Sequence, residues 1–548
     1  MFEIVAKNNI TISNLGIHTY VTEFMLNVQI YTRVGSYRGV ENDITQWILV
    51  TNTTVQGQDV GTPTMLAEAF DPPILIRQNQ RQSFYVTTNG PWLRSTQGTV
   101  EGEENNSDIS FYQGVGKKYP MTSGTFPARI WNGLIQYRIV DDPNSDSAVL
   151  NEVAFRRGDL AVPLPDIGIK VCTGMSARVI ARANQRVALA DGSLSNIPFH
   201  SMPDGAAIFS LDDGGYVYVS NAEMKQNLGG VYGVYFDNHG NVVGYKELLS
   251  GTRRNCSGGK TPWDSWVSCE EYGRGQCWQV DPKGEIPSQI TKLGGAGGNY
   301  ESVAVDNRIP HLPIFFVTED SLRGALRKYT PPIMFEGNST VNTTSGSWDT
   351  LHAEGGTTEY LTFLDGNKFE WTKDEVKARD SQEQHFRNLE GIDYADGHLY
   401  FVSKKLNMLF ILDLDKGTYT SSSTKDGVLA GDGQFHDSPD QLVSIGGEYL
   451  YLTEDGGRTA GIYAIHKPTG QRYAIFEAVD LKYRHDEVTG LAFSLDGNKM
   501  YASFQDCGPQ CKDSEGGLDY NCGCLLEFSR TDGRSFDGST LSLKFHAS

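Results

Sequence analysis

Six side chains that can bind metal recur at similar intervals in the second part of this 548-residue chain. They are Asp204, Cys256, Glu301, Glu390, Asp440 and Glu487. Successive members lie 52, 45, 89, 50 and 47 residues apart, each near the start of a short apolar segment. Carboxylates favour Ca²⁺ or Mn²⁺, and a thiolate among them favours a transition metal such as iron. The pattern predicts a metal site, with turn capping by acids next to glycine as the alternative.

The repeat that carries these side chains predicts a β-propeller. An apolar strand with a polar end recurs six times, as in YVYVSNAE (216–223), IFFVTED (314–320) and YLYLTED (449–455), and a second strand follows each. The longest interval carries an insertion and a short helix near DEVKARDSQEQ. Repeats of about 50 residues are typical of propeller blades, with a double sandwich as the alternative. Because innermost strands surround one channel, the six side chains would converge at one mouth.

Further acids follow the second strands and would add to the charge at that mouth. These additional candidate ligands are Glu223, Glu270, Glu271 and Glu319. So many carboxylates in a confined channel would be very costly without cations to offset their charge.

Residues 1–141 show short alternating apolar segments separated by turn residues, with no helical period and no catalytic constellation. They predict an N-terminal β-sandwich of the jelly-roll kind, with a binding or assembly role. Its expected inner positions are Tyr20, Phe24, Trp47, Phe84, Tyr85 and Trp131. Residues 142–164 are expected to be a linker and residues 165–548 the propeller, so the predicted fold class is all-β.

The segment 2–12 is short, β-prone and lies at the chain's end. It is either the first strand of the sandwich or a strand exchanged with the sheet edge of a neighbouring molecule. Exchange of that kind would build a homo-oligomer, or a filament where the contacts do not close.

The formal charge of −20 argues against nucleic acid and anionic membranes as main partners, because both bind basic surfaces. The chain contains no apolar stretch of ~18 residues, so no membrane span is expected. Its first residues lack a basic segment followed by an apolar run, so they are not expected to be a signal peptide.

Sequons and cysteines favour an oxidising, extracellular setting. N-glycans are expected at Asn9, Asn52, Asn105, Asn338 and Asn342, whereas Asn255 is expected to be unmodified because it precedes Cys256. Four of the eight cysteines lie in CGPQC and CGC (507–524), which predicts two local disulfides, with a zinc site as the alternative. If Cys256 binds metal, at least one other cysteine is unpaired, and Cys172, Cys269 and Cys277 are the candidates.

The segment TRRNCSGGKTPWDSWVSCEEYG (252–273) resembles the signature of the PhoX-type alkaline phosphatases. SPDQL (438–442) and EVTGLAFSLDG (487–497) resemble later blades of that family, so the resemblance covers roughly 165–530. It implies a six-bladed propeller that hydrolyses phosphate monoesters with iron (Fe³⁺) and calcium (Ca²⁺) in its channel. It also implies that Cys256 binds the iron and that the acidic metal shell includes Glu270, Glu271, Glu301, Glu390 and Glu487.

Two departures from the family pattern affect the substrate site. Where the family has an Arg-Pro-Glu whose arginine contacts phosphate, this chain has Asn388-Leu389-Glu390, and the family's His-Glu is here Tyr300-Glu301. Asn388 and its possible substitutes Lys260 and Arg387 are therefore the candidate catalytic residues.

Two functions remain open. The first is a secreted, metal-dependent phosphomonoesterase. The second is an extracellular structural or filament-forming glycoprotein whose PhoX-like propeller is stabilised by metal and is weakly active or inactive. A lactonase-like propeller with one calcium would need fewer acids and no cysteine.

Overall fold

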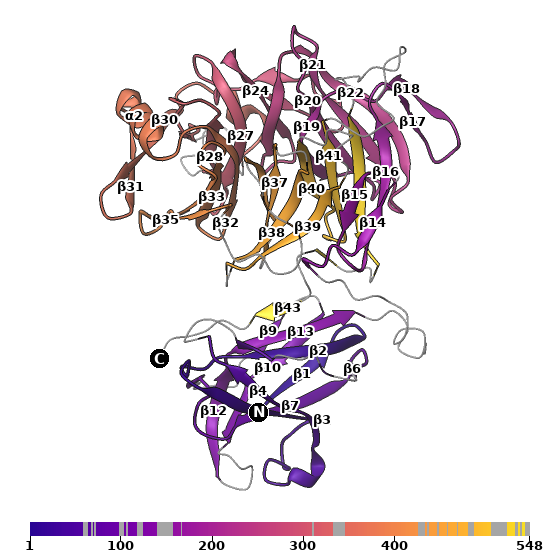
Figure 1. Cartoon of the computed structure of the whole chain (residues 1–548), viewed down its shortest axis with the longest axis vertical. Coiled ribbons are helices and arrows are strands. Elements are labelled where there is room, and N and C mark those ends of the chain that lie inside the picture. Colours follow the sequence, from indigo (N-terminus) through magenta and orange to yellow (C-terminus); the bar gives the residue numbers. More distant parts are fainter. Residues whose placement is uncertain are drawn as a thin grey trace, which may run out of the picture. The chain divides into compact units, whose positions relative to one another are not determined.

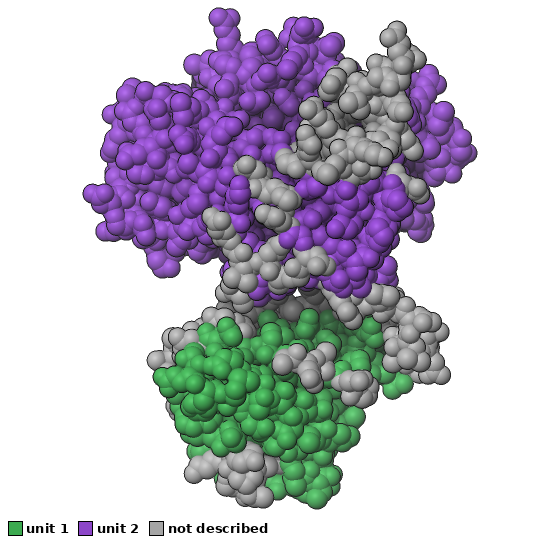
Figure 2. All heavy atoms as spheres, in the orientation of Figure 1, with its two compact units in different colours: residues 1–152, 538–548 green, residues 153–537 purple. Residues whose placement is uncertain are grey.

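The computed structural model describes most of the chain in two compact units. The described residues are 1–58, 64–66, 70, 73–97, 103–105, 108–117, 124–139, 157–165, 167–309, 312–332, 346–425, 433, 435, 438–445, 449–456, 459–467, 470–479, 487–505, 523–531, 535–536 and 540–542. Unit 1 comprises 1–152 with 538–548, and unit 2 comprises 153–537 (Figure 2).

Unit 1 is built from antiparallel β-strands (Figure 1). One sheet has the order β4 (Ile48–Gln56), β3 (Met25–Val34), β7 (Arg81–Thr88), β1 (Phe2–Ala6), β10 (Ile109–Tyr112) and β9 (Glu103–Asn105). A second has the order β43 (Thr540–Ser542), β13 (Gly133–Ile139), β2 (Ile10–Ile17) and β5 (Thr64–Met65), with β6 (Ile74–Ile76) also paired to β2. A small sheet has the order β11 (Gly114–Lys117), β12 (Thr125–Trp131) and β8 (Ser95–Gln97).

The first two sheets of unit 1 share one apolar core, as expected of a sandwich. Phe2 and Ile4 from β1 and Ile12 from β2 are fully buried in it. In this chain β1 lies between β7 and β10 of its own unit. The expectation that Tyr20 and Phe24 lie inside was wrong: both are exposed, because they precede β3 instead of alternating along a strand.

Unit 2 is a ring of six blades. Its innermost strands are β19 (Pro203–Ser210), β23 (Asn255–Lys260), β27 (Gly298–Asp306), β32 (Leu389–Ala395), β36 (Pro439–Ser444) and β40 (Val488–Phe493). Each contacts the next, and β40 contacts β19, so the ring closes. The prediction of a six-bladed propeller is confirmed.

Each blade continues outward in antiparallel order. The second strands are β20 (Tyr216–Ala222), β24 (Trp266–Gly275), β28 (Ile314–Glu319), β33 (His398–Ser403), β37 (Tyr449–Glu454) and β41 (Lys499–Phe504). The third strands are β21 (Gly229–Phe236), β25 (Cys277–Val280), β29 (Arg327–Thr330), β34 (Met408–Asp413), β38 (Gly461–His466) and β42 (Cys524–Arg530). The fourth strands are β22 (Val242–Thr252), β26 (Gln289–Ile290), β30 (Thr357–Leu364), β35 (Thr418–Ser423), β39 (Arg472–Ala478) and β16 (Met175–Arg182). Smaller strands are β31 (Lys368–Thr372), which pairs with β30, and the hairpin β17 (Arg186–Ala188) and β18 (Leu194–Pro198).

The expected helix is α2 (Glu375–His385), which packs against β30 in the insertion between the third and fourth blades. It begins after Asp374, whose side chain accepts a hydrogen bond from the Lys377 amide. Among the described residues, no helix is long and apolar enough to span a membrane.

The expected boundaries need two corrections. The linker expected to run through residue 164 ends earlier, because β14 (Val162–Leu164) pairs with β15 (Ile169–Val171), and β15 joins the blade that contains β39. Val162 and Leu164 pack against that blade's apolar core. The propeller, expected to reach residue 548, ends at residue 537, because β43 pairs with β13 in unit 1.

The described cysteines comprise four free thiols, at Cys172, Cys256, Cys269 and Cys277, and the disulfide-bonded Cys524. The other cysteines of CGPQC and CGC, at 507, 511 and 522, lie outside the described residues.

The sequons lie in varied settings. Asn255 is fully buried and accepts a hydrogen bond from Thr252, so its amide is closed to modification. Asn338 and Asn342 lie outside the described residues.

Candidate metal centre

The innermost strands bring the recurring acids to one end of the propeller channel. Asp204, Cys256, Glu390 and Asp440 are each the second residue of their strand. Glu301 lies near the start of β27, and Glu487 bridges to Asp455 immediately before β40. Because the strands stand side by side around the ring, equivalent positions converge.

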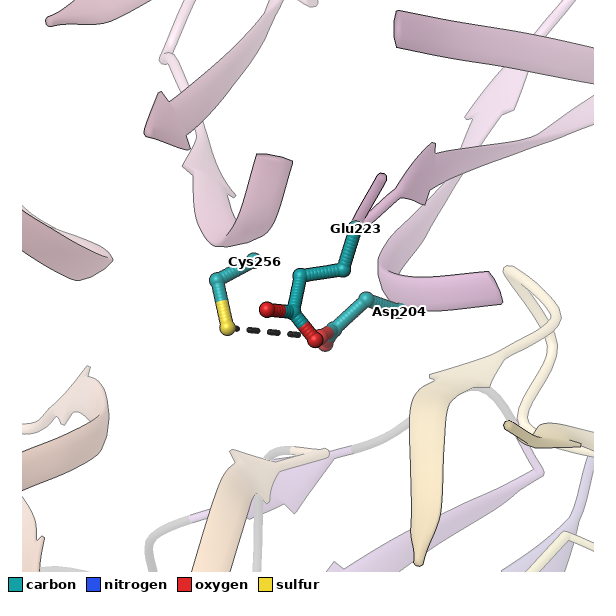
Figure 3. Close-up of side chains that lie close together, drawn as sticks. All are labelled: Asp204, Glu223 and Cys256. Atoms are coloured by element: carbon teal, nitrogen blue, oxygen red, sulfur yellow. Dashed lines mark hydrogen bonds between the residues drawn. The ribbon is translucent and has the colours of Figure 1, made fainter. Parts of the chain in front are cut away.

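Asp204, Glu223 and Cys256 form the first group of potential ligands. One ligand atom from each lies within 4.8 Å of the others. Figure 3 shows the Cys256 sulfur beside the two carboxylates, and the thiol donates to Asp204 Oδ2 at 3.3 Å. Burial is the main cause that raises the pKa of the Cys256 thiol, followed by the charge of Asp204. A metal cation would reverse that shift, because it stabilises the thiolate.

Glu301, Glu390 and Asp440 form the second group, again within 4.8 Å, and all three are buried. Within the described structure neither carboxylate oxygen of Glu301 has a hydrogen-bond partner. Burial, and then the charge of Glu390, raise the pKa of Glu301. Buried carboxylates without donors are costly unless a cation binds them, so the donor set fits a hard cation such as Ca²⁺.

Gln505 and Glu271 extend the site. The Gln505 amide donates to Glu487 Oε1 at 2.7 Å, to Asp204 Oδ2 at 3.1 Å and to Glu223 Oε2 at 3.2 Å. Burial raises the pKa of Glu271 to about 7, and its carboxylate lies 3.6 Å from the guanidinium of Arg254.

Two predicted ligands have other partners. Glu270 accepts hydrogen bonds from the Arg253 and Gln276 amides and from the Trp278 indole. It neighbours Glu271 on β24, and adjacent side chains on a strand point to opposite faces.

Glu319, the other such residue, accepts from the Ala325 amide at 3.0 Å and lies 3.7 Å from Arg379. Neither Glu270 nor Glu319 belongs to the two groups.

The three predicted catalytic residues differ in how they lie relative to the acids. Lys260 donates to the Ile208 carbonyl at 2.8 Å and lies four positions beyond Cys256 on β23, about 13 Å along the strand. Arg387 is exposed. Asn388 has a left-handed backbone (φ 51°), and its amide donates to Asp320 Oδ1 at 2.8 Å.

Lys404 is a candidate functional residue that the sequence reasoning missed. Its Nζ lies 3.3 Å from Glu390 Oε1 and forms an ion pair with Asp455. Its backbone N–H donates to the Asn388 carbonyl at 3.0 Å. The signal was present in the repeat, since the fourth blade has VSKK where the third and fifth have VTED and LTED.

Residues 243–311 match the family model of alkaline phosphatase PhoX. The match contains Cys256, Glu271 and Glu301. It confirms the predicted resemblance to PhoX over these residues and does not extend to unit 1. A comparison with curated protein sequences found no match.

Among solved structures, the fold is similar to that of Pseudomonas fluorescens PhoX, determined in complex with vanadate, a transition state analogue. The two chains are 13% identical, with a TM-score of 0.53, over 71% of this chain and 100% of the PhoX chain. A protein of unknown function from Bacteroides thetaiotaomicron is 11% identical, with a TM-score of 0.36, over 80% of this chain and 87% of its own. The PhoX comparison shows that the fold is shared.

Proposed function

We propose that this protein is a metal-dependent phosphatase, similar to the PhoX alkaline phosphatases, that hydrolyses phosphate monoesters in its propeller channel. The observation that carries the proposal is the buried group of Glu301, Glu390 and Asp440. Within the described structure, both carboxylate oxygens of Glu301 and Oε1 of Glu390 accept no hydrogen bond. The match to the PhoX family model supports the reaction class.

The two groups would hold different cations. The carboxylates of Glu301, Glu390 and Asp440 suit Ca²⁺, whereas the Cys256 thiolate beside Asp204 and Glu223 suits Fe³⁺. Cations bound there would polarise the phosphoryl oxygens and offset their negative charge.

The chain's own cations would bind and orient the ester. Lys404 and Arg254 both lie against the acids, at Glu390 and Glu271 respectively. In phosphoryl transfer, catalysis depends mostly on positioning and on charge stabilisation. Lys404 and Arg254 would supply the positive charge that the family's arginine supplies, and Asn388 would position Lys404 through the hydrogen bond from the Lys404 amide.

Elemental analysis together with p-nitrophenyl phosphate turnover, before and after chelation, tests the proposal. Calcium plus iron, with turnover that chelation abolishes and metal restores, is the expected result. Metal without turnover would reject catalysis and favour an assembly protein with a metal-stabilised propeller. Absence of metal from protein purified without chelators and resupplied with both ions would reject the metal centre itself.

We also propose an extracellular location, with N-glycans at Asn9, Asn52, Asn105, Asn338 and Asn342. The four free cysteines in the described residues do not favour this location. The proposal rests on the sequons and on the disulfide-bonded Cys524. Exchange of the strand 2–12 between copies belongs to the assembly alternative, and electron microscopy of the purified protein would show the filaments.

A further inference from the structure

Unit 1 contains a cavity of about 490 Å³ that has no part in the metal centre. It lies among the end of β7, residues 89–95 and the small sheet of β11 and β12. Its volume is in the range of sites that hold a small organic molecule.

The cavity is lined by three basic side chains, those of Arg94, Lys117 and Arg129. None of the residues described as lining it is an aspartate or a glutamate. In a chain with a formal charge of −20, such a concentration of positive charge favours an anion there.

Arg129 shows an unused donor. Its Nη1 is buried and has no hydrogen-bond partner among the described residues. A buried guanidinium N–H without an acceptor is costly, and an oxyanion bound in the cavity would remove that cost. Such charge-assisted hydrogen bonds are among the stronger ones in proteins.

The other two basic side chains already have contacts within unit 1. Lys117 donates to Asn42 and, at 3.1 Å, to Thr125 Oγ1, and Glu41 is the nearby acid that acts on its charge. The Arg94 guanidinium lies over the Tyr20 ring at 4.2 Å. Both side chains line the cavity together with Arg129, so an anion bound there would meet three basic groups.

Apolar groups complete the wall. Phe126, Trp131, Leu93 and Pro91 line the same cavity as the three cations. A wall of this kind binds carbon skeletons, while the few charged groups fix the orientation.

We propose that this cavity binds a small organic oxyanion. Its carboxylate or phosphate group would bind Arg129 and Lys117, and its carbon skeleton would contact Phe126 and Trp131. The inference does not depend on phosphatase activity, because every residue that carries it lies in unit 1.

Calorimetric titration of the full-length, metal-loaded protein with benzoate, phenylphosphonate and benzyl alcohol tests the proposal. Saturable binding of benzoate or phenylphosphonate is expected, and the stronger of the two identifies the preferred oxyanion. The neutral alcohol, which keeps the ring and lacks the charge, should bind at least tenfold more weakly.

Variants separate this site from the metal centre and from non-specific binding. Arg129→Met and Lys117→Met should each weaken binding at least tenfold, whereas Arg77→Met, at an exposed arginine of the same unit, and Glu301→Gln should leave it unchanged. Two cavity variants are used in case one of them does not fold. Only a variant that keeps the wild-type Tm is counted. Absence of binding, equal binding of the alcohol, or binding unchanged in both folded cavity variants would overturn the proposal.

Discussion

Lys404 Nζ lies 3.3 Å from Glu390 Oε1, and the same ammonium group forms an ion pair with Asp455. Glu390 is 2% exposed at its side chain, whereas Lys404 is 23% exposed. The acid therefore lies inside the channel and the lysine at its edge. On the proposed function, Lys404 would supply a positive charge where a phosphate ester approaches the acids.

Replacing Lys404 by methionine should lower kcat/KM for p-nitrophenyl phosphate about 100-fold, the usual cost of losing one electrostatic contact to a transition state. Lys404→Arg should retain most of the activity, because it keeps the charge. Lys405→Met is the matched control, since Lys405 is adjacent and exposed. If Lys404→Met lowered the Tm but left kcat/KM unchanged, the lysine would be a structural counterion only.

Glu301→Gln should lower the Tm of the metal-loaded protein and raise the Tm of the chelated protein. In the loaded form it removes a ligand, so metal content and Tm should fall; metal bound at 100 to 1,000 times its Kd contributes about 3–4 kcal/mol to stability. In the chelated form burial and the nearby Glu390 and Asp204 raise the pKa of Glu301, which costs folding free energy at neutral pH, so replacing it should raise the Tm. Calorimetry and elemental analysis measure both effects.

The control for Glu301→Gln is Glu285→Gln, which neutralises an exposed carboxylate. It should leave metal content and Tm unchanged in both forms. A Glu301→Gln effect of the same sign and size with and without chelator would contradict a metal site at Glu301.

His200 predicts a pH dependence that is independent of the metal centre. Burial lowers the pKa of His200 to about 3, and its ring nitrogens lie 2.9 Å from Tyr245 Oη and 3.0 Å from Ser220 Oγ. Because the folded pKa lies below the ordinary value of 6.5, the unfolded chain takes up the proton first. The contribution of neutral His200 to the free energy of unfolding is therefore fully present above about pH 6.5. It falls by roughly 4 kcal/mol as the pH is lowered toward 3.

Calorimetry of chelated His200→Gln between pH 7 and pH 4 would measure this contribution. The variant should lose less stability than wild type over the range, because glutamine does not titrate. His239→Gln, at an exposed histidine, should follow the wild-type curve. Parallel curves for wild type and His200→Gln would show that His200 is not buried neutral in solution.

Cys269 and Cys277 predict a test of the proposed extracellular location. They face each other across β24 and β25 with their sulfurs 3.6 Å apart, and both are free thiols here. An oxidising compartment should join them. Mass spectrometry of unreduced protein from its native source should then find one peptide pair lighter by two hydrogen atoms. Cys172, a free thiol on another blade, is the internal control for alkylation, and full alkylation of Cys269 and Cys277 would indicate a reducing compartment.

The inner-strand acids could be predicted because a repeated register places equivalent residues at the same height in the ring. The same argument does not reach Glu270, since choosing between it and Glu271 requires knowing which face of β24 lines the channel. The position of Lys260 also depends on the strand geometry: it shares β23 with Cys256 but lies four positions further along it. Lys404 was missed because the search looked for acids, and a single lysine in an acidic repeat has meaning only beside Glu390.

The ring of blades can close only late in synthesis, and this bears on when the proposed metal site is complete. The last blade is completed by β16, which comes before the first blade and pairs with β42, so Met175 lies opposite Arg530. During synthesis β16 therefore waits for a partner until nearly the whole chain has left the ribosome. The candidate ligand positions extend from Asp204 to Glu487, so the complete set converges only after the last innermost strand, β40, has formed. If metal binds there as proposed, its full set of ligands would be available only after the ring has closed.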